Sequence, residues 1–260
     1  MNSSEYPGTF DGVVQILQRL RGPDGCPWDR EQTRDSLKSQ FLEEVYELIE
    51  AIEQGDTEKI IEEIGDVILH VVYQVQIGEE AGEFNRERVF QTLVEKLLRR
   101  HPHVFGDANV ADADDAVVKW QAIKQQERAD TGASILDGAP RQMPALLYAQ
   151  AIQERAARIG FDWEDLQGAL DKITEELEEL EQAQSDSERE SELGDVLFSI
   201  VNAARWQGID AESALRHSNA RFYQRFVTME RLSRENDQSL PDLSLNEKEA
   251  LWQEAKRLLD

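Results

Sequence analysis

Apolar residues recur along this chain of 260 residues with the spacing of three to four that is typical of amphipathic helices. The two clearest stripes are Phe41, Val45, Leu48, Ile49 and Ile52, and Ile173, Leu177 and Leu180. No segment alternates apolar and polar residues over the length of a strand. The pattern therefore predicts an all-α fold. It places further helices near residues 9–21, 86–100, 114–129, 145–158, 210–235 and 245–259.

Two more predicted helices are apolar on most sides, and they continue from Gly65-Asp66 and from Gly194-Asp195. Such helices usually pack on several faces, so we expect Asp66 and Asp195 to enter a core. A glycine inside a helix costs roughly 1 kcal/mol relative to alanine. We therefore expect a helix or a ligand to approach each glycine closely.

Each half of the chain contains a matching set of two acidic pairs whose members are three residues apart. The first half has Glu44 with Glu47 and Glu63 with Asp66, and the second has Glu176 with Glu179 and Glu192 with Asp195. On a helix, a spacing of three puts both carboxylates on one face. Two such helices side by side form an oxygen-rich anionic pocket that requires hard divalent cations such as Mg²⁺ or Mn²⁺. Single acidic runs are usually solvated helix faces, but the repetition favours a metal site.

The repeat also predicts the domain organisation. Glu44 matches Glu176 at an offset of 132 residues, whereas Asp66 matches Asp195 at 129, so we expect a loop three residues shorter between the second pair of helices. Glycine and proline interrupt the helical pattern between the two copies. We predict an N-terminal domain at 1–130, a linker at 131–144 and a C-terminal domain at 145–260.

Composition narrows the class of protein. The 53 acidic and 28 basic residues give a net charge of −25, which would repel nucleic acid. The chain has one cysteine, Cys26, and no apolar run as long as the ~18 residues of a membrane span. Its first residues lack the pattern of a signal peptide. We expect a cytoplasmic protein with no nucleic-acid or membrane partner.

Four further segments, taken in order with the acidic sets, resemble the MazG family of nucleoside triphosphate pyrophosphohydrolases. They are LRGPDGCPWDREQT from Leu20, RRHPHVFG from Arg99, RIGFDW from Arg158 and WQEAK from Trp252. The resemblance implies tandem all-α domains whose helices form a four-helix-bundle type of core across a homodimer. It also implies hydrolysis of NTPs and dNTPs to the monophosphate and pyrophosphate, with a role in nucleotide-pool control or house-cleaning.

The resemblance assigns roles to particular residues. All eight acids become Mg²⁺ ligands, with two or three ions per site and Mn²⁺ as a substitute, and Glu176 is our first choice of general base. The substrate-binding candidates are Lys172, Arg189, Arg221, Arg225, Trp252 and Lys256. The family often has a lysine one position before Arg189. Because the first half has no comparable arrangement, we expect the C-terminal domain to be the principal catalytic one.

Two alternatives stay open. One is a narrower pyrophosphatase of the same superfamily, acting on dUTP, dCTP or phosphoribosyl-ATP. The other is a non-catalytic module in which acidic helices bind a basic partner or metal. We expect weak base discrimination, because the base-stacking candidate is Trp252 and stacking tolerates every base. Two residues are expected to be structural, with Trp28 docked in the core and His70 buried in a helix.

Overall fold

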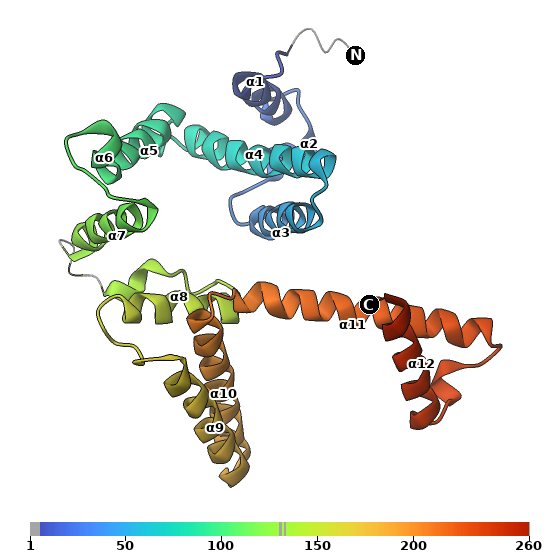
Figure 1. Cartoon of the computed structure of the whole chain (residues 1–260). Helices are drawn as coiled ribbons and strands as arrows, with labels where there is room; N and C mark the ends of the chain where they lie inside the picture. Colours follow the sequence, from blue (N-terminus) through green and yellow to red (C-terminus); the bar gives the residue numbers. More distant parts are fainter. Residues whose placement is uncertain (1–5, 130–131, 133, 260) are drawn as a thin grey trace. The chain divides into compact units, whose positions relative to one another are not determined.

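The computed structural model describes residues 6–129, 132 and 134–259, and it divides them between two compact units, Met1–Ile123 and Lys124–Asp260. All regular elements in these ranges are helical (Figure 1), so the predicted all-α class is confirmed. Of the predicted linker, residues 131 and 133 lie outside the described residues, as does residue 130 before it. No helix in the described ranges has both the length and the apolar character needed to cross a bilayer.

The first unit is built on a long pair of helices. Its elements are α1 (Phe10–Arg21), α2 (Pro27–Glu31), α3 (Lys38–Gln54), α4 (Thr57–Glu80), α5 (Arg86–Arg100), α6 (Pro102–Phe105) and α7 (Ala113–Ala129). Helix α4 packs against both α3 and α1. Helix α7 extends beyond Ile123, where the first unit ends.

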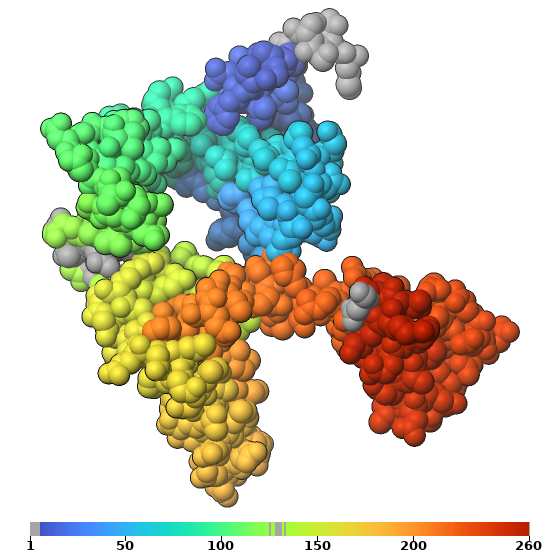
Figure 2. All heavy atoms as spheres, viewed as in Figure 1, coloured from blue at the N-terminus to red at the C-terminus, as the bar shows by residue number. Residues whose placement is uncertain are grey.

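The second unit contains a similar pair. Its elements are η1 (Ile135–Gly138), α8 (Ala145–Ala157), α9 (Leu166–Gln182), α10 (Asp186–Trp206), α11 (Ala211–Glu235), η2 (Leu240–Asp242) and α12 (Leu245–Leu259). Helices α9 and α10 pack on each other, and α8 packs on α10. Helix α12 packs on α11, as the orange and red atoms in Figure 2 show.

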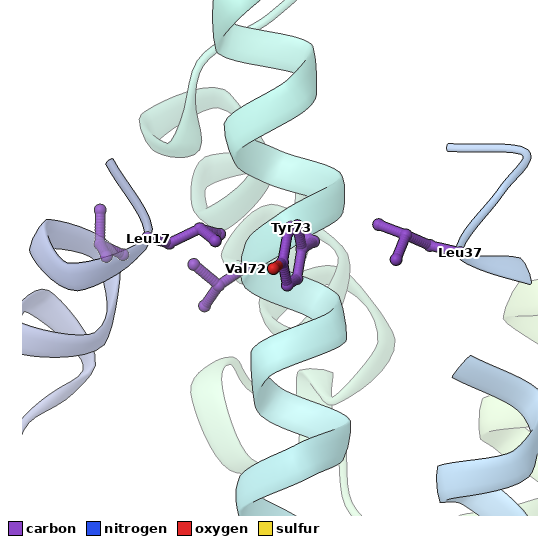
Figure 3. Close-up of a cluster of buried hydrophobic side chains, with 5 residues drawn as sticks. Leu17, Leu37, Val72 and Tyr73 are labelled. Atoms are coloured by element: carbon purple, nitrogen blue, oxygen red, sulfur yellow. The ribbon is translucent and has the colours of Figure 1, made fainter. Parts of the chain in front are cut away.

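The first unit has a small apolar core around α4. Leu17 of α1 and Leu37 at the start of α3 pack against Val72 and Tyr73 of α4 (Figure 3). Val14 of α1 belongs to the same cluster. Tyr73 also donates a hydrogen bond from its hydroxyl to the buried carboxylate of Asp29. The core therefore includes one polar contact that ties α2 to α4.

Trp28 does not dock in this core. The residue is 52% exposed, and the neighbouring Asp29 is buried instead. Pro27 begins α2 at its first position, and this short helix directs Asp29 inward, where Tyr73 satisfies it. The prediction for Trp28 was wrong, while His70 is buried as predicted.

The length difference between the two acid-bearing pairs does not lie in a shorter loop. Gly55 and Asp56 join α3 to α4, and Gly55 takes a left-handed conformation (φ 69°) that glycine adopts readily. The second connection, Ala183 to Ser185, is one residue longer. Instead, α9 ends at Gln182, soon after Glu176, whereas α3 continues further beyond the matching Glu44, to Gln54. The expected loop deletion is thus a difference in helix length.

Neither glycine of the two Gly-Asp pairs meets the close neighbour that we expected. A Cβ built on Gly65 or Gly194 would find no atom of another described element within 4 Å. Asp66 is half-buried, but Asp195 is exposed, so the expectation that it enters a core is wrong for the single chain. Helix α10 has apolar residues on more sides than α8, α9 and α11 cover.

Candidate functional site

Three of the four acids in the first unit come together. Glu44 from α3 and Glu63 and Asp66 from α4 each place a carboxylate oxygen within 4.8 Å of the others. Burial raises the pKa of Glu44, and the charges of Asp66, Glu47 and Glu63 raise it further. Glu47 is exposed and lies outside this group.

The second unit repeats the arrangement with a different third member. Glu176 and Glu179 of α9 and Glu192 of α10 bring carboxylate oxygens within 4.8 Å of one another. Burial raises the pKa of Glu179, and the neighbouring charge of Glu176 adds to it. Asp195 is not part of this group, although it lines the cavity next to it.

The chemistry of both groups fits a hard divalent cation. All their donor atoms are carboxylate oxygens, which Mg²⁺ and Mn²⁺ prefer. Carboxylates this close repel each other, and a bound cation would relieve that repulsion. Glu63 and Glu176 are the most buried members, and Lys59 and Lys172 pair with them at 2.6 and 2.7 Å.

His70 lies beside the first group without belonging to it. Its ring stacks on Phe41 with centroids 5.6 Å apart, and its Nε2 is 3.9 Å from a carboxylate oxygen of Glu44. Burial lowers the pKa of His70, although the charge of Asp66 opposes this. His70 therefore packs beside the acidic group and is not one of its metal-ligand candidates.

A cavity of about 490 Å³ adjoins the second group of acids. It lies between α8, α9 and α10 and is closed on one side by the loop from Gly160 to Trp163. Glu176, Asp195 and Lys172 line the cavity where it meets the acids, and the ion pair of Asp162 with Arg205 also lines it. Most of the remaining lining is apolar and includes Phe161 and Trp163. This size and mixture are typical of a site for a small organic molecule.

The other predicted substrate contacts lie outside this cavity. Arg189 is exposed on α10 and pairs with Asp186. Arg221 and Arg225 lie on α11, and Lys256 and Trp252 lie on α12. The ring centroids of Trp252 and Phe222 are 5.2 Å apart. Lys172, by contrast, lines the cavity and pairs with Glu176.

Sequence reasoning missed most of the cavity. Its unforeseen residues include Gln153, Phe161, Trp163, Phe198, Asn202 and Arg205. A signal was present in RIGFDW, because two aromatic residues directly before an acid-bearing helix are well placed to border its site. The residues on α8 and α10 carry no such signal, since a helix pattern does not show which face borders a cavity.

Known proteins resemble this chain along nearly its full length. A family model described as the MazG nucleotide pyrophosphohydrolase domain matches residues 32–105. A Thermotoga maritima protein named nucleoside triphosphate pyrophosphohydrolase/pyrophosphatase MazG is 45% identical over 95% of both chains. An Escherichia coli K12 protein named nucleoside triphosphate pyrophosphohydrolase is 40% identical over 95% of this chain and 97% of its own. This chain belongs to the family of MazG nucleotide pyrophosphohydrolases.

Proposed function

We propose that this chain hydrolyses nucleoside and deoxynucleoside triphosphates to the monophosphate and pyrophosphate in a Mg²⁺-dependent reaction. The observation that carries the proposal is the group of Glu176, Glu179 and Glu192 beside a cavity large enough for a nucleoside. The names of the relatives from Thermotoga maritima and Escherichia coli support the same reaction.

Two or three Mg²⁺ ions per site, replaceable by Mn²⁺, are part of this proposal. The residues that would hold them are Glu176, Glu179, Glu192 and Asp195 in the second unit and Glu44, Glu47, Glu63 and Asp66 in the first. Such ions, when bound, neutralise phosphate oxygens and lower the pKa of a water molecule. The clustered acids support this assignment because an anionic triphosphate could not approach them otherwise.

Glu176 is the proposed general base. It is 5% exposed and belongs both to the acidic group and to the cavity lining, so it lies where a water and the substrate would meet. Lys172 holds it through an ion pair of 2.7 Å. When a triphosphate binds, Lys172 could leave the Glu176 carboxylate and pair with a phosphate oxygen instead.

The active form is proposed to be a homodimer. Large apolar side chains on the acid-bearing helices are exposed in the single chain: Ile61, Ile64, Ile68 and Val71 on α4, and Leu193, Leu197 and Ile200 on α10. Continuous exposed apolar faces of this kind usually bind a partner. The open space at Gly65 and Gly194 is also consistent with a helix from a second copy. Light scattering that gives a monomer at micromolar concentration would rule this out.

A dimer would give the remaining substrate-binding candidates a role. The candidates on α11 and α12 do not line the cavity beside the acids; they are Arg221, Arg225, Trp252 and Lys256. We propose that they reach the triphosphate bound by the partner. Mixing an Arg221→Ala variant with a Glu192→Ala variant should then restore turnover, because mixed dimers contain one intact site. No gain on mixing would contradict contact across the interface.

Broad base tolerance and a house-cleaning role in the cytoplasm complete the proposal. Turnover of the common NTPs and dNTPs should fall within roughly two orders of magnitude, about 2.7 kcal/mol in transition-state binding. The net charge of −25 supports the expectation that nucleic acid is not a partner.

A panel of these nucleotides, with all products quantified by ion-exchange chromatography, tests the reaction. Monophosphate and pyrophosphate in equal amounts are expected. Diphosphate and phosphate would contradict the proposal, and no turnover of any nucleotide would favour the non-catalytic module. Preference for one nucleotide by more than about a thousandfold, near 4 kcal/mol, would favour a narrower pyrophosphatase.

A further inference from the structure

We infer that the nucleoside of the substrate binds in the cavity between α8, α9 and α10, with its base against Phe161 and Trp163 and its polar edge at Gln153 and Asn202. The inference rests on the proposed function, since it places the same substrate at the same acids. It differs from the sequence-based expectation, which gave the stacking role to Trp252.

The cavity has the order of groups that a nucleotide requires. Asp195 and Asn202 lie on the same side of α10, both lining the cavity, seven residues and thus about 10 Å apart along the helix axis. The acids therefore mark one end of the cavity and Asn202 lies toward the other. A nucleotide whose phosphates meet the acids would extend its base along α10 toward Asn202.

Aromatic side chains border the path of the base. Phe161 lines the cavity although the residue is 80% exposed, and exposure of a phenyl group is unfavourable unless something covers it. Trp163 packs over Gly168, where an added Cβ would lie 3.0 Å from the indole ring. Gly168 thus makes room for the indole at the cavity wall, and a planar base offers both aromatic rings a stacking partner.

Gln153 supplies a hydrogen-bond acceptor with no partner. It is buried, and its Nε2 donates a 2.8 Å bond to the carbonyl oxygen of Phe198. A carbonyl can only accept, so this bond fixes the orientation of the amide. The Oε1 of Gln153 is buried and has no hydrogen-bond partner among the described residues. An unpaired buried acceptor is unfavourable, and an N–H group on a base would satisfy it.

Asn202 supplies the complementary donor. Its Oδ1 accepts two hydrogen bonds from Arg205, at 3.0 and 2.7 Å. A guanidinium only donates, so the Nδ2 of Asn202 must be the other end of the amide. Arg205 is itself held by an ion pair with Asp162 in the loop before α9. The cavity thus presents one acceptor and one donor. Each of the common bases has both a donor and an acceptor on its hydrogen-bonding edge, so this pair can bind several bases and agrees with broad base tolerance.

The first unit differs at the corresponding place. Counting from the two Gly-Asp pairs, Tyr73 of α4 takes the position of Asn202 on α10. The Tyr73 ring belongs to the apolar core, and its hydroxyl bonds to Asp29. The position that borders the cavity in the second unit is therefore filled by a core side chain in the first unit.

Equilibrium binding of nucleoside monophosphates to the full-length protein, measured by calorimetry with Mg²⁺, tests the inference without requiring turnover. Trp163→Ala should weaken binding by about tenfold or more through lost stacking. Gln153→Met, which keeps the side-chain length and removes the acceptor, should weaken it by about tenfold. Trp28→Ala, which replaces an exposed tryptophan far from the cavity in sequence, is the matched control and should leave binding unchanged.

Inhibition by inorganic tripolyphosphate separates the nucleoside from the phosphates. Its inhibition constant for NTP turnover should be the same in the wild type, Trp163→Ala and Gln153→Met, because tripolyphosphate has no base. Unchanged monophosphate binding in both variants would overturn the inference, and so would a greater loss of binding in Trp252→Ala than in Trp163→Ala. If pyrophosphate is still released, the proposed function stands in either case. Normal binding with no pyrophosphate release would instead refute the proposed function alone.

Discussion

The ammonium of Lys172 lies 2.7 Å from a carboxylate oxygen of Glu176, four residues further along α9. Lys59 and Glu63 repeat this ion pair on α4 at 2.6 Å. In each unit, the most buried acid of the group is the one with a lysine four residues before it. The two buried acids are not equivalent in the repeat, because Glu63 matches Glu192 and not Glu176. The lysine therefore accompanies the buried carboxylate and does not keep one repeat position.

Replacing Lys172 with methionine should destabilise the metal-free protein. Glu176 would lose the cation that offsets its burial, at a cost of about 1–2 kcal/mol, which is less than for a fully buried pair because Lys172 reaches solvent. Mg²⁺ should restore most of the difference, since it supplies the missing positive charge. Thermal melting with EDTA and with Mg²⁺ measures both effects. A deficit that stays the same when Mg²⁺ is added would show that the ion does not bind at Glu176.

The two groups of acids should contribute unequally to turnover. In the full-length protein, Glu176→Gln combined with Glu192→Gln should lower kcat/KM for ATP by about a hundredfold or more, because both metal ligands and the base are lost. Glu44→Gln combined with Glu63→Gln should stay within about threefold of wild type. Steady-state pyrophosphate release compares them. A larger loss of kcat/KM in the Glu44→Gln and Glu63→Gln variant would assign catalysis to the first unit.

Much of the fold follows from local pattern, because each helix carries its own signals. Thr9, Asn85 and Asp165 cap the helices that follow them, and the predicted and observed ends of α1 and α5 agree within one residue. The five-residue α2 is too short to show a helical period, so the pattern did not predict it. The burial of Asp29 depends on Tyr73, 44 residues away, which no local pattern reveals.

The candidate site was predictable where chemistry repeats in sequence. The spacing of the acids placed Glu44 with Glu63 and Glu176 with Glu192 correctly. The spacing could not show that Glu47 and Asp195 lie outside the two groups, since this depends on how α3 packs on α4 and α9 on α10. The cavity depends on the packing of α8 against α10, and Gln153 shows no sign of this contact in the sequence.

The contact between Tyr73 and Asp29 should stabilise the first unit. Tyr73→Phe keeps the ring in the core and removes the hydroxyl, leaving the buried Asp29 carboxylate without this donor. The expected loss is about 1–3 kcal/mol in the free energy of unfolding. Denaturant unfolding measures it, with Tyr46→Phe at an exposed position as the control. An equal effect of the two substitutions would show that the contact contributes nothing specific.

The ion pair of Arg21 with Glu80 should make stability depend on pH on the acid side. The hydrogen bonds from Arg21 lower the pKa of Glu80 below its usual 4.5, although burial opposes this. A depressed pKa stabilises the fold above the unfolded value and loses that contribution as pH falls through the folded value. The stability gap between wild type and Glu80→Gln should therefore be widest near neutral pH and narrow below about pH 4.5.

Chemical denaturation at several pH values checks this expectation. Glu31→Gln, at an exposed position of α2, serves as the control and should run parallel to the wild type. A gap between wild type and Glu80→Gln that stays constant down to pH 3 would mean that Glu80 does not titrate with the predicted shift.

Pyrophosphate release from ATP by the full-length protein, measured with Mg²⁺ and with EDTA, tests the central claim most directly when the wild type is compared with Glu192→Ala. Glu192 belongs to the acidic group beside the cavity. The account predicts turnover with Mg²⁺ for the wild type, none with EDTA, and none for a folded Glu192→Ala. Turnover that survives EDTA, or near-normal turnover by Glu192→Ala, would contradict it.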